Sequence, residues 1–251
     1  MKRPSSSITP RTGTSKLIRI ADDLSKDVES LRFSAPVTHV YNPLLYARDS
    51  YVAYLLKYAT PPKEVVFLGM NPGPWGMVQT GIPFGEIRTV QDWLRIESHV
   101  GRPAKEHSGR PVVGMECRRS EVSGRRLWGW ARETFGTPQG FFKRFFILNY
   151  CPLAFFDEAG RNRTPDHMPI KDRIALYVVC DRALKRTTEV LQPRHVIGIG
   201  RFAEERARKA LEGTGIHVAG VPHPSPANPA ANKNWMGLFV SALTGAGIRI
   251  R

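Results

Sequence analysis

Short apolar runs alternate with longer amphipathic stretches along this chain. Four runs of mostly apolar residues, bounded by charged residues, glycine or proline, have the length and composition of buried strands. We predict these strands over residues 64–70, 144–153, 195–200 and 216–224. Apolar positions at helical spacing predict helices before and between them, over residues 49–59, 170–191 and 201–213. Because helices separate successive strands, we expect an α/β fold with a mainly parallel sheet.

The helix predicted over residues 201–213 has one clear buried face. That face consists of Phe202, Ala203, Ala207, Ala210 and Leu211, whereas Arg201, Arg208 and Lys209 fall outside it. The sequence GIG, which precedes this helix, resembles part of a nucleotide-binding turn. Close packing of a helix against a strand explains these glycines equally well.

Length and composition predict one domain. A chain of 251 residues, 41% of them hydrophobic, can bury one core but holds little material for two independent ones. The chain begins with a stretch rich in Ser, Thr, Lys and Arg, which is poorly suited to packing. We therefore predict a basic, flexible segment over residues 1–30 and a single domain over residues 31–251.

The strongly positive charge indicates the kind of partner that the protein binds. The formal net charge is +15 and the isoelectric point is about 10.2, values that favour a polyanion. Nucleic acid is the first candidate, an acidic membrane surface the second, and a generically basic soluble enzyme the alternative to both. No apolar run approaches the roughly 18 residues that a membrane span needs. We expect a cytoplasmic protein, or a nuclear one in a eukaryote.

The cysteines predict neither disulfides nor a metal site. Cys117, Cys151 and Cys180 are widely spaced and odd in number, which suits reduced, buried thiols. Three cysteines are also one too few for the four that iron–sulfur clusters use. We expect no metal and no cofactor.

Three polar residues follow predicted strands at places where the backbone is constrained by proline or glycine. Asn71 follows the first strand, Asn149 lies near the end of the second, and His223 follows the fourth. In an open parallel sheet, ligands bind beyond the carboxyl ends of the strands. Taken singly, Asn71 could cap its turn, Asn149 could tie loops together, and His223 could be structural. Their shared position at strand exits favours a site.

Two amides and one imidazole limit the chemistry. No nucleophile, carboxylate pair or metal-ligand cluster accompanies them, so serine-type hydrolysis and two-carboxylate glycoside cleavage have no evident residues. The substrate would have to supply a good leaving group itself.

The motifs around these residues resemble a known family. They are GMNPGPWGMVQTGIPFGE (69–86), NYCPL (149–153) and HPSPANPAANKNW (223–235), with further similar stretches at 120–130, 160–165 and 198–211. In order and spacing they resemble the single-strand-selective monofunctional uracil-DNA glycosylases, over about residues 40–245. The resemblance implies a three-layer α/β/α sandwich with a short, mainly parallel central sheet. It also implies a monomeric enzyme that binds DNA and removes uracil without cutting the strand.

The same resemblance assigns roles to the residues of the base pocket. Asn71 would position the attacking water, and His223 would donate a hydrogen bond to uracil O2 as charge develops there. Asn149 would read uracil N3–H and O4, and Phe84 would stack on the flipped ring. Met70 is assigned to the same pocket.

Two further positions concern the range of substrates. Gly73 would lie beside uracil C5 and admit a substituent there, so we expect excision of 5-hydroxymethyluracil and poor handling of thymine. The loop residues Pro224, Ser225, Pro226, Ala227 and Asn228 would bind DNA and enter the duplex. The family commonly has arginine where Ala227 stands. We therefore expect a stronger preference for single-stranded uracil than is usual in the family.

Three alternatives remain open at this stage. One is a non-catalytic protein that binds single-stranded nucleic acid, and another is a glycosylase acting mainly on deaminated purines such as xanthine. A Rossmann-like nucleotide enzyme is the third, although a full GxGxxG motif is missing.

Four arginines are candidates for phosphate contacts, namely Arg118, Arg119, Arg125 and Arg126, with a solvated charged loop as the alternative. Lys233 is the only lysine within the three motifs, which argues against Schiff-base chemistry.

Overall fold

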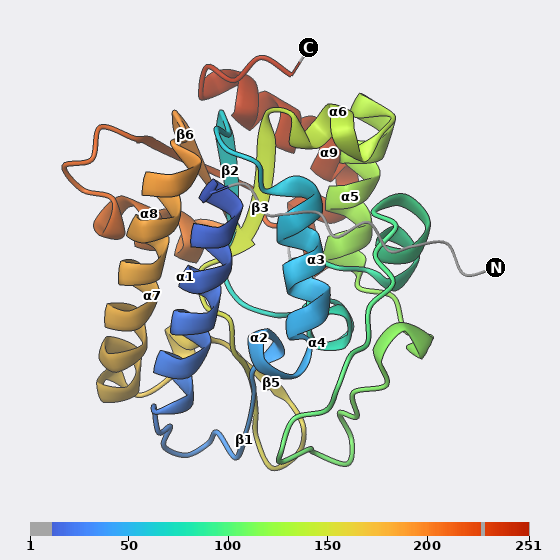
Figure 1. The fold of residues 1–251 in the computed structure, drawn as a ribbon, viewed down its shortest axis with the longest axis vertical. Coiled ribbons are helices and arrows are strands. Elements are labelled where there is room, and N and C mark those ends of the chain that lie inside the picture. Colours follow the sequence, from blue (N-terminus) through green and yellow to red (C-terminus); the bar gives the residue numbers. More distant parts are fainter. Residues whose placement is uncertain (1–11, 227–228, 251) are drawn as a thin grey trace.

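A four-stranded parallel sheet forms the centre of the protein. The computed structural model describes residues 12–226 and 229–250. The sheet has the order β3-β2-β6-β7, and every neighbouring pair is parallel (Figure 1). Its strands are β2 (Val65–Gly69), β3 (Phe145–Asn149), β6 (His195–Ile199) and β7 (His217–Val221). All four predicted strands, and their parallel arrangement, are confirmed.

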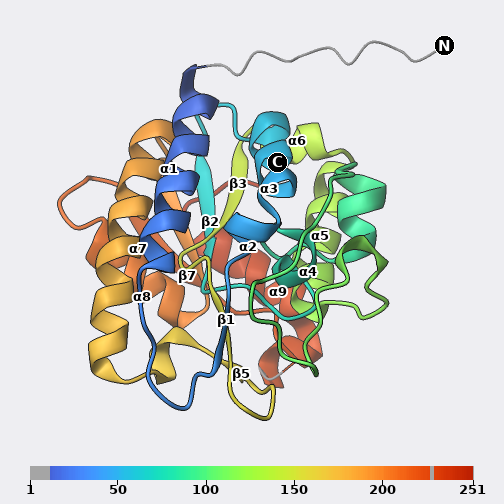
Figure 2. The same cartoon turned by 60° about the horizontal axis from the view of Figure 1, so that its bottom comes forward.

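Helices cover both faces of this sheet and give the expected three-layer sandwich (Figures 1 and 2). One face carries α1 (Thr12–Glu29), α3 (Arg48–Tyr58), α7 (Ile170–Leu191) and α8 (Arg201–Ala210). The other carries α5 (Val122–Phe135), α6 (Pro138–Phe142) and α9 (Pro229–Gly245). Short helices lie in the connections: α2 (Pro43–Tyr46), α4 (Met77–Thr80), a π-helical turn (Thr89–Trp93) and two 3-10 turns (Gly114–Glu116 and Pro165–His167).

Alternating side chains of the strands hold the layers together. On β3, Phe146 stacks on Tyr54 of α3, with ring centroids 5.0 Å apart. Its neighbour Phe145 points to the other face, where its ring meets that of Trp130 of α5 edge-on at 6.4 Å. Phe67 of β2 joins the same aromatic cluster. Because these strands are buried on both faces, they appear in the sequence as continuous apolar runs.

A second, smaller sheet was not expected from the sequence. It is antiparallel, with the order β1-β4-β5, and consists of β1 (His39–Tyr41), β4 (Ala154–Phe156) and β5 (Asn162–Arg163). Strands of two or three residues are too short for a recognisable alternation of polar and apolar positions. The sheet anchors the chain soon after it leaves β3.

The predicted flexible segment over residues 1–30 is wrong for residues 12–29, which form α1; residues 1–11 lie outside the described part of the chain. Leu17, Ile20 and Val28 of this helix are buried, and α1 packs against α7. The helix was missed because the start of the chain is rich in polar residues, although its few apolar residues recur at helical spacing. On the outer side, ion pairs join Asp22 to Arg48 and Asp27 to Arg182.

The helix after β6 has the predicted buried face, and its packing explains the first glycine of the GIG sequence. Its buried residues are Ala203, Ala207, Ala210 and the following Leu211, with Phe202 partly buried and Arg201, Arg208 and Lys209 exposed. A Cβ atom added to Gly198 would lie 2.2 Å from the backbone nitrogen of Glu204. Close approach of helix and strand therefore accounts for this glycine without a nucleotide.

Two further sequence predictions concern the rest of the chain. Cys117, Cys151 and Cys180 are unpaired and buried, as expected. Among the described residues, no helix has both the length and the apolar character of a membrane span.

Gly198→Ala should destabilise the protein, because the new methyl group meets backbone atoms that cannot move independently. We expect a loss of about 1–3 kcal/mol in the free energy of unfolding, measured by urea denaturation. Gly129→Ala in α5 is the matched control, since nothing lies within 4 Å of its added Cβ. That variant should be unchanged or gain up to about 1 kcal/mol. Equal effects of the two substitutions would contradict the packing argument.

Candidate active site

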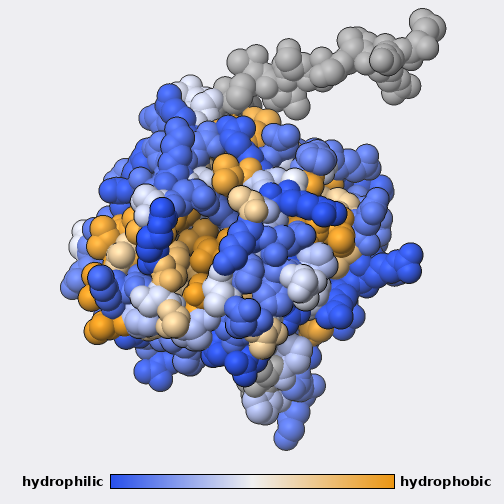
Figure 3. Space-filling view, turned by 90° about the horizontal axis from the view of Figure 1, so that it is seen from below, coloured by the Kyte–Doolittle hydropathy of each residue, from blue (hydrophilic) through white to orange (hydrophobic). Residues whose placement is uncertain are grey.

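A small cavity of about 60 Å³ lies where β2, β3 and β7 end. The six pocket residues that the sequence predicted, apart from the wedge loop, all line it. The complete lining consists of Met70, Asn71, Gly73, Met77, Phe84, Glu121, Ser123, Asn149 and His223. Seen from the end at which the strands exit, the molecular surface is mostly hydrophilic (Figure 3). The three residues that the strand-exit argument selected, Asn71, Asn149 and His223, thus lie at one cavity.

Backbone hydrogen bonds join the exits of β2 and β3. Gly69 and Asn149 are register partners in the parallel pair. Beyond them, the Tyr150 N–H donates to the Gly69 carbonyl at 2.9 Å, and the Cys151 N–H donates to the Met70 carbonyl at 2.9 Å. The two loops are therefore fixed relative to each other at the point where their asparagines emerge.

Asn71 links the two loops instead of capping its own turn. Its Nδ2 donates to the Leu153 carbonyl at 3.1 Å. This bond fixes which end of the amide is oxygen, and no described residue donates to Oδ1. Asn71 therefore presents an oriented acceptor, which is what a water molecule needs if it is to be held by one of its protons.

The amide oxygen of Asn149 is buried and has no hydrogen-bond partner among the described residues. Its Nδ2 is 3.2 Å from the sulfur of Met77. A buried polar atom left unpaired costs roughly 1–3 kcal/mol, so its presence at a cavity wall indicates a donor that arrives with a ligand. Asn149 is thus not a closed structural link between loops.

Phe84 has a backbone conformation that residues other than glycine rarely adopt. Its φ is 55°, in the left-handed region, and the indole Nε1 of Trp128 donates to its carbonyl at 3.1 Å. A Cβ on Gly69 would lie 2.6 Å from Cε2 of Phe84 and 2.4 Å from Oδ1 of Asn149. The missing side chain at Gly69 lets an aromatic face and an amide share the floor of the cavity.

His223 is a neutral hydrogen-bond donor. Burial lowers the pKa of its imidazole to about 4, so the ring carries no charge near pH 7. The Ser225 N–H donates to its Nδ1 at 3.1 Å, which requires the ring proton to sit on Nε2. Its ring centroid lies 6.2 Å from that of Phe84. The site therefore offers an N–H group without a full positive charge.

Arg126 holds the loop that carries His223. Its Nη1 donates to the Pro224 carbonyl at 2.9 Å, and its Nη2 donates to Oδ1 of Asn232 at 3.0 Å. Asn232 in turn donates to the Pro226 carbonyl at 2.7 Å. Arg126 is thus engaged inside the protein, which differs from its candidate role as a phosphate contact. Arg118, Arg119 and Arg125 are exposed, and the guanidinium of Arg119 stacks 4.3 Å from the ring of Trp75.

Some parts of the prediction stay open, and some lining residues were missed. Pro224, Ser225 and Pro226 are described, whereas Ala227 and Asn228 lie outside the described residues. Met77, Glu121 and Ser123 line the cavity without having been predicted. Glu121 and Ser123 belong to the similar stretch 120–130, but they lie at the start of α5 and not at the end of a strand, so the strand-exit rule did not select them.

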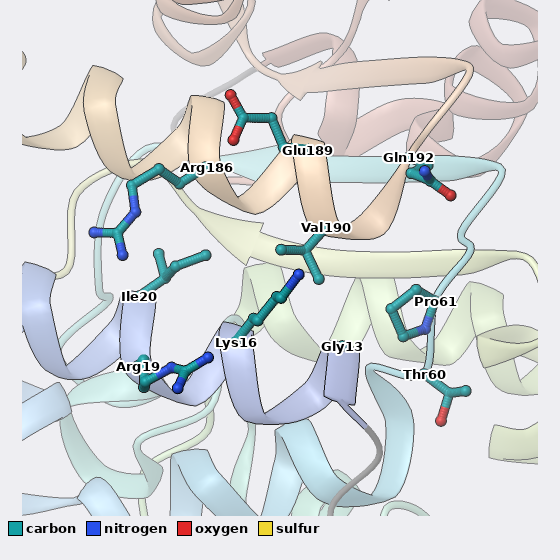
Figure 4. A pocket seen from close by; sticks show the side chains of 10 residues that line it. All are labelled: Gly13, Lys16, Arg19, Ile20, Thr60, Pro61, Arg186, Glu189, Val190 and Gln192. Atoms are coloured by element: carbon teal, nitrogen blue, oxygen red, sulfur yellow. The ribbon is translucent and has the colours of Figure 1, made fainter.

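A larger pocket of about 550 Å³ lies at the opposite end of the sheet, where β2 begins (Figure 4). Its lining includes Thr60 and Pro61, which precede β2, and the basic side chains Lys16, Arg19 and Arg186. It shares no lining residue with the small cavity. Volume alone is therefore a poor guide to the chemistry of this protein.

The pKa of His223 yields a prediction about stability. Because the folded-state pKa is about 4 and the model-compound value is 6.5, the unfolded chain takes up this proton first as the pH falls. His223 should therefore cost the protein up to about 3 kcal/mol of stability between pH 6.5 and pH 4, and nothing above that window.

Urea denaturation over this pH range should show a steeper loss for the wild type than for His223→Gln, which lacks the titrating group. Titration of the imidazole by NMR should place its midpoint near pH 4, with the proton of the neutral ring on Nε2. A midpoint near 6.5 would contradict the burial of this side chain.

Comparison with known proteins agrees with the geometry. Residues 56–244 match the uracil DNA glycosylase superfamily. The chain is 50% identical over 214 residues to the single-strand selective monofunctional uracil-DNA glycosylase of Rattus norvegicus, covering 84% of this chain and 77% of that protein. It is 47% identical over 227 residues to the Bos taurus protein of the same description, covering 90% and 84%.

A solved structure shows the same fold. The crystal structure of wild-type Pedobacter heparinus SMUG2 superposes with a TM-score of 0.67 at 18% identity, covering 94% of this chain and 98% of that one. The family predicted from the three motifs is confirmed. This chain belongs to the uracil-DNA glycosylase superfamily, within which it is similar to the single-strand selective monofunctional enzymes.

Proposed function

We propose that this protein hydrolyses the N-glycosidic bond of uracil in DNA and leaves an abasic site in an intact strand. The observation that carries this proposal is that Asn71, Asn149 and His223 line one small cavity. Among the described residues, the Asn149 oxygen there has no hydrogen-bond donor. The relatives named as uracil-DNA glycosylases support it, as does a net charge of +15. Enzymes of this kind must turn the base out of the stack to reach it.

Recognition of uracil would use its polar edge. Among the described residues the Asn149 oxygen has no donor, and uracil N3–H would supply one. Cytosine has an acceptor at N3 instead. A lone pair of cytosine N3 would then face a lone pair of the Asn149 oxygen. Phe84 supplies the aromatic face on which the ring would stack, an interaction that contributes about 1–3 kcal/mol per base. The constrained backbone of Phe84 keeps this face in place before the base arrives.

In the proposed reaction, His223 would assist departure of the base and Asn71 would position the attacking water. As the bond between C1′ and N1 breaks, its electron pair passes to the uracil ring, and the Nε2–H of His223 donates to O2, where negative charge grows. The sugar becomes electron-poor, so a water held by the Asn71 oxygen is a sufficient nucleophile. The water oxygen bonds to C1′, and its proton leaves to solvent or to the departing base. The step requires no metal and no cofactor.

The site also supports a reaction that stops at the abasic product. Cutting the strand would need an amine that forms a Schiff base with the sugar. Among the described residues that line the cavity there is no lysine, and Lys233 is exposed on α9. The strand should therefore remain intact until alkali or another enzyme cuts it.

Substrate range extends this proposal in two directions. A substituent at uracil C5, including hydroxymethyl, would be admitted beside Gly73, which lines the cavity. The place of the Cβ that Gly73 lacks is taken by the carboxyl group of Glu121, because that atom would lie 2.4 Å from Oε2. Single-stranded DNA would be preferred to duplex, since alanine at position 227 cannot fill the space left by a flipped base. The relatives from Rattus norvegicus and Bos taurus are named single-strand selective, which supports this preference.

The proposal predicts alkali-dependent cleavage of a labelled single-stranded oligonucleotide that contains one uracil, in the presence of EDTA. Single-turnover rates should fall on the order of 10²-fold or more for Asn71→Ala and for His223→Ala. Asn162→Ala and His99→Ala, at exposed positions away from the cavity, are matched controls and should retain the wild-type rate.

A duplex arm with uracil opposite guanine should react more slowly than the single strand. Binding of DNA without release of uracil by the wild type would refute the enzyme and favour a binding protein. Loss of activity in EDTA would refute the metal-free mechanism.

Arg126→Ala should slow uracil release by roughly tenfold or more, because the carbonyl of Pro224 and the side chain of Asn232 lose their shared donor and the His223 loop is misplaced. Arg132→Ala, an exposed arginine of the same helix, is the control for lost charge. If both variants slow the reaction equally, general charge and not loop position is responsible.

A further inference from the structure

Two histidines face each other at the end of the sheet where β6 and β7 begin. His195 is the first residue of β6, His217 is the first residue of β7, and the two are register partners in the parallel pair. Side chains of register partners project from the same face of a sheet, so the pairing of the strands itself places the two rings together. Because 22 positions separate these histidines in the chain, only the fold reveals the pair.

The separation of the two rings matches that of two ligands on one metal ion. Imidazole nitrogens bind Zn²⁺ at roughly 2.0–2.1 Å in tetrahedral geometry, which sets two such nitrogens about 3.4 Å apart. The Nδ1 atoms of His195 and His217 are 3.3 Å apart, with the ring planes at 73°. Both nitrogens would therefore reach one ion without any movement of the strands.

The surroundings leave this pair accessible but supply no further ligand. His217 is exposed and His195 is partly exposed. The carboxylate of Glu64, just before β2, is held by Arg144 at 2.6 and 3.0 Å. Among the described residues, the pair belongs to no group of three or more His, Cys, Asp or Glu side chains placed to hold a metal. Water would have to complete the coordination of an ion bound here.

A second pair of neighbouring histidines lacks these features. The ring centroids of His39 and His107 are 4.9 Å apart. Both nitrogens of His107 are engaged, because Nδ1 accepts from the Gly109 N–H at 2.9 Å and Nε2 lies 3.0 Å from the Glu158 carbonyl oxygen. Nδ1 of His39 lies 2.9 Å from the hydroxyl oxygen of Thr38. Closeness of two rings is thus not enough, and the facing nitrogens distinguish the first pair.

We propose that His195 and His217 bind one Zn²⁺ ion through their Nδ1 atoms, with water in the remaining positions. Two neutral rings share one hydrogen bond between these atoms, in which one Nδ1–H donates to the other Nδ1. On binding, that proton moves to Nε2 of the same ring, and each Nδ1 donates its lone pair to the ion. Imidazole suits Zn²⁺, whereas Mg²⁺ prefers oxygen ligands, so Mg²⁺ does not bind here.

The bound ion ties the beginnings of two strands together. It adds a link between β6 and β7, and an ion that binds the folded chain in preference to the unfolded one stabilises it by mass action. The small cavity lies at the other end of β7, beyond Val221. The ion therefore takes no part in the proposed reaction, and this site goes beyond the proposed function.

The test is calorimetric titration of the EDTA-treated and dialysed full chain with zinc chloride. One site per chain is expected. His195→Gln and His217→Gln should each weaken this site about tenfold or more, because loss of a direct ligand costs at least as much as loss of a group that only supports one. His39→Gln, from the second pair, is the matched control and should keep the wild-type affinity. Magnesium chloride should give no binding.

NMR of the imidazole nitrogens provides a second measurement that does not depend on the variants. Zinc should shift the Nδ1 signals of His195 and His217 and leave both rings protonated on Nε2. The inference is overturned if the wild type binds no zinc at millimolar concentration. It is also overturned if both variants of the pair keep the wild-type affinity, or if His39→Gln weakens binding by the same factor.

Discussion

The parallel pairing of β2 with β3 is the constraint on which the site depends. Register places Gly69 beside Asn149, and two further backbone hydrogen bonds continue the pairing beyond the strands. A slip of one residue would send Asn149 to the other face of the sheet, away from Asn71. The aromatic core that fills both faces of β3 opposes such a slip. Packing away from the cavity thereby determines the distance between the amides of Asn71 and Asn149.

Two polar side chains of the cavity have few partners among the described residues. The Asn149 oxygen has no donor there, and Glu121 accepts one long hydrogen bond from the Trp75 N–H. The His223 ring is neutral because burial lowers its pKa. A buried polar atom without a partner costs stability, and in the proposed function a base with matching groups would remove that cost. A neutral imidazole also suits a leaving group that is itself a weak base, because donor and acceptor need only share a proton. In the proposed function, binding and chemistry would use polar groups of the same cavity.

The sequence revealed the parts of the molecule that repeat a strong pattern. β2 and β6 are largely apolar runs, Asn71 and His223 follow strands, and Asn149 ends one. The sheet, and the meeting of these three residues at one cavity, could therefore be predicted. β5 has only two residues, which is too short for any periodicity. Arg126 looked like a surface charge because its partners lie about a hundred positions away in the chain. Glu121 was missed as a lining residue because only the folded chain brings it against Gly73 and Gly76.

The most direct test of this account is a crystal structure of Asn71→Ala bound to a single-stranded oligonucleotide that contains uracil. The base should lie in the small cavity on Phe84, with N3 within hydrogen-bond distance of the Asn149 oxygen and O2 within that distance of His223 Nε2. A base that occupies another part of the surface, or one that presents C5 to Asn149, would contradict the proposed arrangement.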